Sequence, residues 1–130
     1  MTWPLGVIAH HGNILLRRRA QQGLLAGLWE VPGGKQESDE TARQVLVRQF
    51  ASSRGLLNRM KLVGEARHSI TRYKIRAPIF FSSAATRTIP GAGEWRWVPL
   101  SSVAQYPLTS LSIKAIRFVV SRLRISGAKR

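Results

Sequence analysis

The feature that most constrains this sequence is a strand, a Pro-Gly-Gly turn and an amphipathic helix in direct succession. Residues 28–31 (LWEV) have the pattern of a short apolar strand, and Pro-Gly-Gly at 32–34 ends it. The segment 38–54 follows, and its mostly apolar residues recur at a helical spacing: Ala42, Val45, Leu46, Gln49 and Phe50. This spacing predicts a helix with one face on a core.

Both ends of that helix carry further signals. Ser38 can cap it, and Asp39 and Glu40 would lie in its first turn, where the helix dipole favours negative charge. Gly55 would end it. A second helix is predicted over 110–124 from apolar residues with the same spacing: Leu111, Ala115, Ile116, Val119, Val120 and Leu123.

Strands fill most of the remaining chain. The first two, 5–9 and 14–16, form a hairpin about the turn signal Gly12-Asn13. The others are expected at 62–66, 70–81 and 94–98, with a helical turn at 99–104. The 130 residues suit one domain, 1–125, followed by a basic tail at 126–130. The predicted fold class is α/β (α+β), an αβα sandwich of a mixed sheet and two main helices.

Charge narrows the possible functions. The chain has 21 Lys and Arg against 6 Asp and Glu, a formal net charge of +15, which predicts a polyanionic partner. The absence of cysteine excludes disulfides, thiolate catalysis and Cys-ligated zinc or iron–sulfur clusters. No stretch reaches about 20 apolar residues and the first residues are unlike a signal peptide. We therefore expect no membrane contact and a cytoplasmic (nucleoid-associated) or otherwise intracellular protein that is not secreted.

Five residues across the turn and the first helix lie at fixed spacings: Gly34, Glu40, Arg48, Gly55 and Leu56. With this spacing the segment resembles the Nudix box, G-x5-E-x7-R-E-U-x-E-E-x-G-U, in which U is aliphatic. The three metal-binding acids of the box are replaced here by Gln49, Ser52 and Ser53. The resemblance implies a Nudix-like fold. Because Mg²⁺ prefers carboxylate oxygens, the replacements predict that this site binds metal weakly or not at all. We accordingly expect a domain with no cofactor and no catalytic residues.

Four segments carry a second resemblance: 23–34 (GLLAGLWEVPGG), 68–72 (HSITR), 97–100 (WVPL) and 106–108 (YPL). On these segments, roughly residues 4 to 124 resemble the C-terminal domain of MutY, the adenine DNA glycosylase. That family domain is a Nudix-like module that lost hydrolysis and recognises 8-oxoguanine opposite adenine in DNA. The resemblance therefore implies a non-catalytic domain of base excision repair. Adenine removal would belong to an upstream glycosylase catalytic domain, and this chain is either cut from such an enzyme or a standalone relative.

The resemblance also implies which residues touch DNA. The family's Phe-Ser-His loop corresponds to Ile70, Thr71 and Arg72, so Thr71 would place a hydroxyl near the oxidised base. Arg72 could hold a phosphate or a carbonyl edge. The full set of expected nucleic-acid contacts is His68, Ser69, Ile70, Thr71, Arg72, Arg17, Arg19 and Arg48.

Several features also have plain structural interpretations. Arg17 to Arg19 fit a solvated strand end as well as phosphate contacts, and His68 fits a hydrogen-bonded structural histidine. Trp95 and Trp97 share one face of a strand, where core packing is favoured over base stacking. The basic face of the last helix is either solvated or a polyanion contact, and its residues are Lys114, Arg117 and Arg124.

Two other functions stay open. The first is a Nudix hydrolase of nucleoside di- or triphosphates such as 8-oxo-dGTP, with unusual ligands for Mg²⁺, and Glu40→Gln would abolish it. The second is an RNA- or protein-binding adaptor, because a fold does not fix a function.

Overall fold

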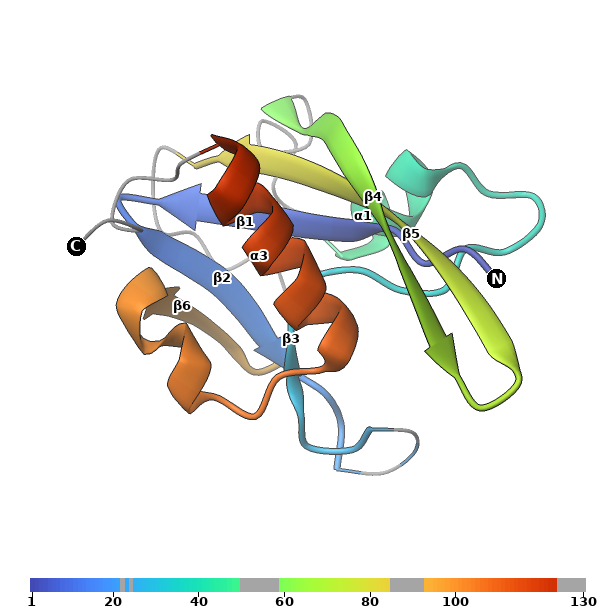
Figure 1. The fold of residues 1–130 in the computed structure, drawn as a ribbon, viewed down its shortest axis with the longest axis horizontal. Coiled ribbons are helices and arrows are strands. Elements are labelled where there is room, and N and C mark those ends of the chain that lie inside the picture. The colour runs from blue at the N-terminus through green and yellow to red at the C-terminus, as the bar shows by residue number, and fades with distance from the viewer. Residues whose placement is uncertain (22, 24, 50–58, 85–92, 124–130) are drawn as a thin grey trace.

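The computed structural model describes residues 1–21, 23, 25–49, 59–84 and 93–123 (Figure 1). The elements run in the order β1 (Leu5–His10), β2 (Asn13–Arg18), β3 (Trp29–Glu30), α1 (Ala42–Gln49), β4 (Lys61–Ile70), β5 (Tyr73–Ser83), β6 (Trp95–Pro99), the 3-10 helix η1 (Leu100–Gln105) and α3 (Ser110–Leu123). The expected tail at 126–130 lies outside the described residues, as do Arg124 and the expected helix end at Gly55.

The strands form one mixed sheet in the order β3-β2-β1-β5-β4. β1 and β5 are parallel, with Val7 opposite Phe81, and the other strand pairs are antiparallel. β2 pairs with β1 near the first hairpin, with β3 at its far end, and with β6 along its other edge. The prediction of a mixed sheet is confirmed.

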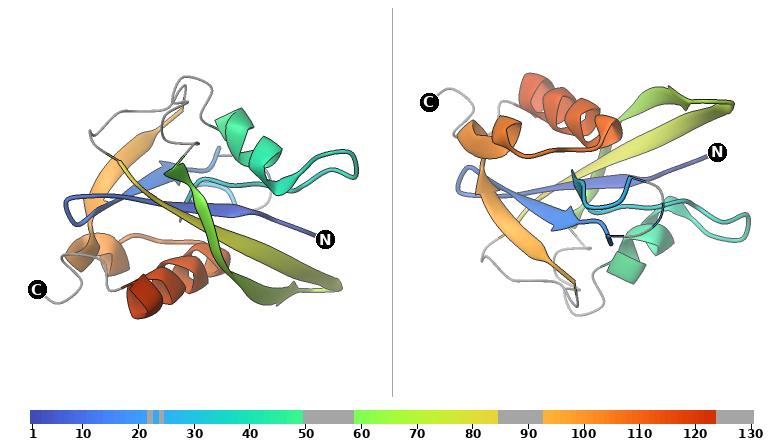
Figure 2. Two further views of the ribbon diagram at one scale, coloured as in Figure 1. Left: turned by 90° about the horizontal axis from the view of Figure 1, so that it is seen from above. Right: turned by 90° about the horizontal axis from the view of Figure 1, so that it is seen from below.

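The two helices cover opposite faces of this sheet, as the two turned views in Figure 2 show. The core on the α3 side contains the buried residues Val7, Ile79, Ala115 and Val119. The core on the α1 side is smaller, and Leu46 packs there against Ile8, Leu15, Met60 and Phe80. The predicted αβα sandwich is therefore confirmed, and its apolar area is divided between two separate faces.

Helix α1 begins at Ala42, so the expected start at Ser38 was wrong. Thr41 caps the helix: its hydroxyl accepts a hydrogen bond from the Gln44 N–H at 3.2 Å, and the Gln44 side chain accepts one from the Thr41 N–H at 2.7 Å. This reciprocal pair is a capping box, which satisfies two backbone donors at once. Ser38 and Asp39 instead form a turn before the helix, and no acid lies in its first turn.

Two turns also differ from the prediction. The first hairpin turns at His11-Gly12 and not at Gly12-Asn13, and both turn residues have positive φ, 46° and 81°. The predicted strand over 70–81 is divided, because Thr71 and Arg72 form the turn between β4 and β5. Thr71 has a φ of 51°, so it is a turn residue and not the strand residue that its propensity suggested.

β4 runs from Lys61 to Ile70 and is longer than the strand expected at 62–66, because its pairing with β5 continues to the turn. The last three elements agree closely with the sequence. α3 covers 110–123 of the predicted 110–124, and β6 and η1 lie within one residue of their expected starts. Trp29 is 6% exposed in the core, and Trp95 and Trp97 pack against the cluster on the α1 side, as expected. No helix in the described ranges is long and apolar enough to cross a membrane.

Candidate functional site

The Pro-Gly-Gly turn holds the box against the start of β1. The Pro32 carbonyl accepts a hydrogen bond from the Gly6 N–H at 2.8 Å, and the Gly34 N–H donates to the Pro4 carbonyl at 3.3 Å. A Cβ on Gly33 would lie 2.3 Å from the Pro4 carbonyl oxygen, whereas one on Gly34 would meet nothing closer than 3.8 Å. The close backbone approach therefore requires glycine at 33, and Gly34, which matches the box, has room for a side chain.

Two residues of the box neutralise each other. The Arg48 Nε lies 2.8 Å from one carboxylate oxygen of Glu40, and the other oxygen accepts from Arg48 Nη2 at 3.0 Å. The second oxygen also accepts from the Glu37 N–H at 3.0 Å. The carboxylate of Glu40, the one acid retained at a fixed position of the box, is thus held by a guanidinium and a backbone amide.

Gln49 is held in the same way by an arginine from β2. The Arg17 guanidinium donates to the Gln49 side-chain oxygen, to Glu30 at 2.9 Å and to the Gly33 carbonyl at 3.2 Å. It also lies over the Trp95 ring, 5.3 Å from its centroid. Arg17 therefore joins β2, β3, the Pro-Gly-Gly turn and α1.

Glu30 is the centre of this network. Its carboxylate is 6% exposed and binds Arg17 through one oxygen and Arg19 through the other, at 2.9 and 3.0 Å. Arg18 alternates to the opposite face, where it lies 3.6 Å from Glu94. Neither Arg17 nor Arg19 is a simple solvated strand end. Sequence reasoning missed Glu30, although an acid between Trp29 and Val31 in an apolar strand is itself a signal of a buried charge.

The described residues do not supply a metal site. Ser52, Ser53 and Gly55 lie outside the described ranges. Within those ranges, no three His, Asp or Glu side chains gather closely enough to hold an ion. The amide of Gln49 and the paired Glu40 do not match the carboxylate set that Mg²⁺ requires.

An apolar groove of about 480 Å³ extends from this network to the β4–β5 hairpin. Arg19, Glu30 and Lys35 line its side nearest the box, and His68 and Tyr73 line its hairpin side. The segment that leads into α3 closes it with apolar and hydroxyl side chains: Leu108, Thr109, Ser110 and Leu111. The fold thus brings Arg19 and His68 together, whereas Arg48 does not line the groove.

The hairpin presents the expected recognition residues at the end of the sheet. Ser69, Thr71 and Arg72 are exposed there, and the backbone of Ile70 pairs with Tyr73. Tyr73 is 59% exposed although it lines the groove. Sequence reasoning missed Tyr73, because the signal is only its place two residues after Thr71, which becomes informative once the turn is known.

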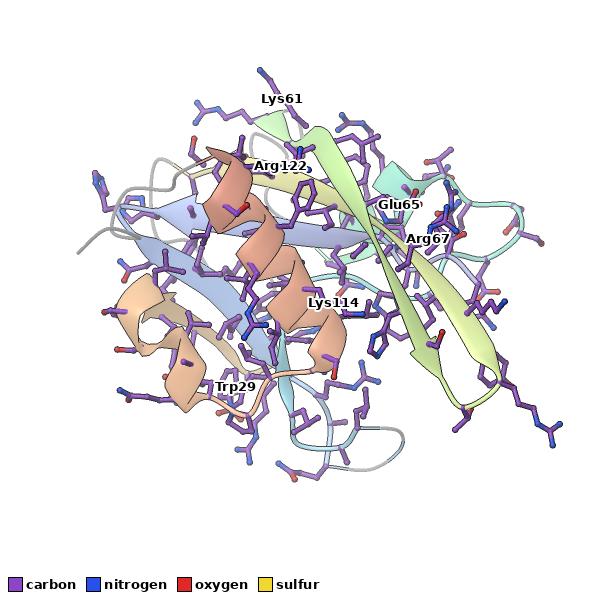
Figure 3. All side chains as sticks on the ribbon, in the orientation of Figure 1. Trp29, Lys61, Glu65, Arg67, Lys114 and Arg122 are labelled. Carbon is purple, nitrogen blue, oxygen red and sulfur yellow. The ribbon has the colours of Figure 1, made fainter. Side chains whose placement is uncertain are left out.

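His68 lies beside a lysine of α3. The Lys114 ammonium donates to His68 Nδ1 at 2.8 Å and to the Arg67 carbonyl at 2.9 Å, and Figure 3 shows Lys114 between α3 and β4. Partial burial, and then the charge of Lys114, lower the pKa of His68. Because an ammonium only donates, the acceptor must be the unprotonated Nδ1 of a neutral imidazole. His68 is thus a hydrogen-bonded histidine that lines the groove.

Known proteins resemble both the sequence and the fold. The chain is 48% identical to the CTP pyrophosphohydrolase of Escherichia coli K12 over 50 residues, which are 38% of this chain and 37% of that protein. It is 38% identical to the 8-oxo-dGTP diphosphatase of Proteus vulgaris over 52 residues, 39% of this chain and 46% of that protein. The similarity thus spans less than half the length of these relatives.

Solved structures show the same fold over nearly the whole chain. The NUDIX domain of Shewanella oneidensis NrtR, in complex with ADP ribose, has a TM-score of 0.76 at 20% identity, over 95% of this chain and 88% of that one. The C-terminal domain of mouse MUTYH, in complex with human PCNA, has a TM-score of 0.71 at 23% identity, over 95% and 89%. Residues 5–117 match the NUDIX domain family, to which this chain therefore belongs.

Proposed function

We propose that this domain binds DNA that contains 8-oxoguanine opposite adenine, and that it does so without hydrolysing nucleotides. One observation carries the proposal: arginines occupy the polar groups of the box, Arg48 on Glu40 and Arg17 on Gln49. Gln49 stands where the box has a metal-binding acid, and its neutral amide oxygen already accepts from Arg17, so it offers no anionic ligand for Mg²⁺. Glu40, which is not one of the three metal-binding positions, is neutralised by Arg48. What remains is a nucleotide-sized groove in a domain of formal charge +15.

The groove suits an oxidised purine. Its volume of about 480 Å³ and its mostly apolar wall are typical of sites that enclose a small planar group. Tyr73 offers an aromatic face at its edge, where a base can stack. Thr71 and Arg72 at the hairpin turn supply a hydroxyl and a guanidinium for the edge of the base or a neighbouring phosphate.

Similar proteins also support a role in binding DNA or an oxidised guanine. The fold is shared with the C-terminal domain of mouse MUTYH, and a NUDIX-containing regulator, Shewanella oneidensis NrtR, has been solved with a 27mer DNA. A relative from Proteus vulgaris acts on 8-oxo-dGTP, an oxidised guanine nucleotide. In our proposal, a separate glycosylase catalytic domain removes the adenine. This NUDIX domain binds the DNA, in the cytoplasm or nucleoid.

The test is binding to short duplexes that carry 8-oxoguanine or guanine opposite adenine, measured by fluorescence anisotropy at several salt concentrations. We expect tighter binding to the lesion and an affinity that falls as salt rises, because phosphate contacts release counterions. Thr71→Val should reduce the preference for the lesion, whereas Ser38→Ala, which removes a hydroxyl from the loop before α1, should not. Binding that is indifferent to both lesion and salt would refute the proposal.

Hydrolysis is the second candidate, favoured by the 48% identity with a CTP pyrophosphohydrolase and by the presence of Glu40. Incubation with CTP or 8-oxo-dGTP and Mg²⁺, followed by assay of released phosphate and pyrophosphate, decides between the two. Release that disappears in Glu40→Gln would establish a hydrolase. In the same binding assay, a preference for RNA over DNA would favour an RNA adaptor.

A further inference from the structure

A second hollow lies next to the groove and shares a wall with it. Its volume is about 570 Å³, and His68 and Ile75 line both cavities. The hollow lies between the β4–β5 hairpin and the first turns of α3, which contributes Lys114 (Figure 3). None of the box residues Gly34, Glu40, Arg48 and Gln49 lines it.

This hollow is strongly basic. Its wall carries four basic side chains, Arg67, Lys74, Arg76 and Lys114, and the amino group of Met1 lies there as well, 3.2 Å from the Lys74 carbonyl. One carboxylate, Glu65, opposes them: it pairs with Arg67 at 3.1 Å and with Arg76 at 3.2 Å. Four cations against one carboxylate leave an excess of positive charge in a concave surface, which concentrates field lines on an anion.

Lys74 and Lys114 are the two basic residues of this hollow that no described carboxylate neutralises. Among the described residues, neither lysine is within ion-pair distance of a carboxylate. The Lys114 ammonium has three N–H groups and directs two of them to His68 and the Arg67 carbonyl. Its third N–H is thus positioned by the protein and remains for a ligand oxygen.

The opposite side of the groove is arranged differently. There Arg19 shares the carboxylate of Glu30 with Arg17, and Arg48, which does not line the groove, is held by Glu40 in the adjoining box. A phosphate on that side would have to compete with carboxylates that are 6% and 17% exposed. Lys35 is the one cation on the wall near the box that makes no ion pair with a described acid, so it marks the rival position.

We infer that the basic hollow holds a backbone phosphate of the nucleic acid whose base enters the groove, so that the strand leaves the groove toward β4 and α3 and away from the box helix α1. The inference rests on the proposed binding of nucleic acid and adds the direction in which the bound strand runs. Phosphate contacts fix register and orientation, and Lys114 is suited to this task because the protein already holds its ammonium.

The experiment compares Lys114→Gln with Arg117→Gln. Both remove one positive charge from an exposed position of α3, but only Lys114 lines the hollow. With a duplex carrying 8-oxoguanine opposite adenine, Lys114→Gln should weaken binding about fivefold at low salt. It should also lower the slope of log affinity against log salt by about one. Lys114→Arg should recover most of both effects, and Arg117→Gln should change neither slope nor affinity by a comparable amount.

A second measurement locates the phosphate. Duplexes in which one phosphate beside the lesion is an uncharged methylphosphonate should bind wild-type protein less tightly at one position. A methylphosphonate at that position should not weaken the binding of the Lys114→Gln variant any further. Equal effects of Lys114→Gln and Arg117→Gln would overturn the inference, as would a loss confined to Lys35→Gln. In either case wild-type binding to DNA would persist and the proposed function would stand. If wild-type protein bound no nucleic acid, both would fall.

Discussion

The buried carboxylate of Glu30 offers the sharpest test of how this site is held together. In Glu30→Gln the side chain keeps its size but loses its charge and one acceptor. The amide nitrogen would then face a guanidinium, donor against donor, because Arg17 and Arg19 each use a different oxygen of Glu30. Two partly buried cations would share a single neutral acceptor.

The magnitude follows from burial. Removing one partner of a buried ion pair costs about 3–5 kcal/mol. The guanidiniums of Arg17 and Arg19 are 22% and 23% exposed and keep some hydration, so we expect a loss of about 3 kcal/mol in the free energy of unfolding. For a domain of this size, that corresponds to a fall of about 10 °C in Tm.

The measurement is urea denaturation followed by tryptophan fluorescence, with linear extrapolation to water. Trp29 lies next to Glu30 and is 6% exposed, so its emission reports directly on this region. Glu94→Gln is the matched control, since Glu94 is 50% exposed and 3.6 and 3.9 Å from its arginines. That change should cost less than about 0.5 kcal/mol. If the two variants lost similar stability, Glu30 would not be the centre of the network.

Three smaller predictions concern the loop, the helix start and the histidine. Thr41→Ala should cost about 1 kcal/mol of unfolding free energy through loss of the cap, and Ser38→Ala almost nothing; equal losses in urea denaturation would contradict the observed helix start. Gly33→Ala should cost about 2 kcal/mol or more, because its Cβ would meet the Pro4 carbonyl, whereas Gly34→Ala should be tolerated. The pKa of His68 is lowered by folding, so the unfolded chain binds the proton more readily and stability falls as pH drops through the ordinary value of 6.5. Melting curves of His68→Gln should show a smaller loss over that range, and an identical pH dependence would exclude this contribution.

Sequence periodicity was sufficient to identify the two helices and most strands, because their apolar faces repeat at regular spacing. The start of α1 required a choice between neighbouring signals. Asp39 and Glu40 favour a start at Ser38, but Thr41 and Gln44 form the capping box, and Glu40 is drawn to Arg48. A threonine followed three residues later by glutamine was visible in the sequence and was the better signal.

The division of the predicted strand over 70–81 had no comparable local signal. Thr71-Arg72 is not a dipeptide that favours positive φ, and threonine has a high propensity for strands. The turn is fixed by register across the hairpin, in which His68 lies opposite Ile75 and Ile70 opposite Tyr73. Pairing over the length of β4 and β5 outweighs the local preference of Thr71, which sequence spacing alone could not reveal.

The roles of the arginines depend on the same long-range pairing. Arg17 lies opposite Glu30 across β2 and β3, and Arg19 follows directly after the end of β2, so both arginines reach the same buried acid. The number of basic residues in the chain predicts that a polyanion will bind. It does not distinguish arginines that are paired with acids, such as Arg17 and Arg19, from basic residues that are available to bind a phosphate. That distinction requires knowing where the few carboxylates lie.

The positions of the acids therefore decide which cations can face DNA. Four of the six acidic residues pair with arginines among the residues that the structure describes: Glu30, Glu40, Glu65 and Glu94. Two of these, Glu30 and Glu40, neutralise arginines beside the box, the side on which a hydrolase would bind its metal and phosphates. On the other side of the groove a single acid, Glu65, opposes four cations. The box has lost the carboxylates that hydrolysis needs, and two of the remaining acids neutralise the arginines beside it. The positive charge that is available to DNA therefore lies on the β4–β5 hairpin and α3, and not on the box helix α1.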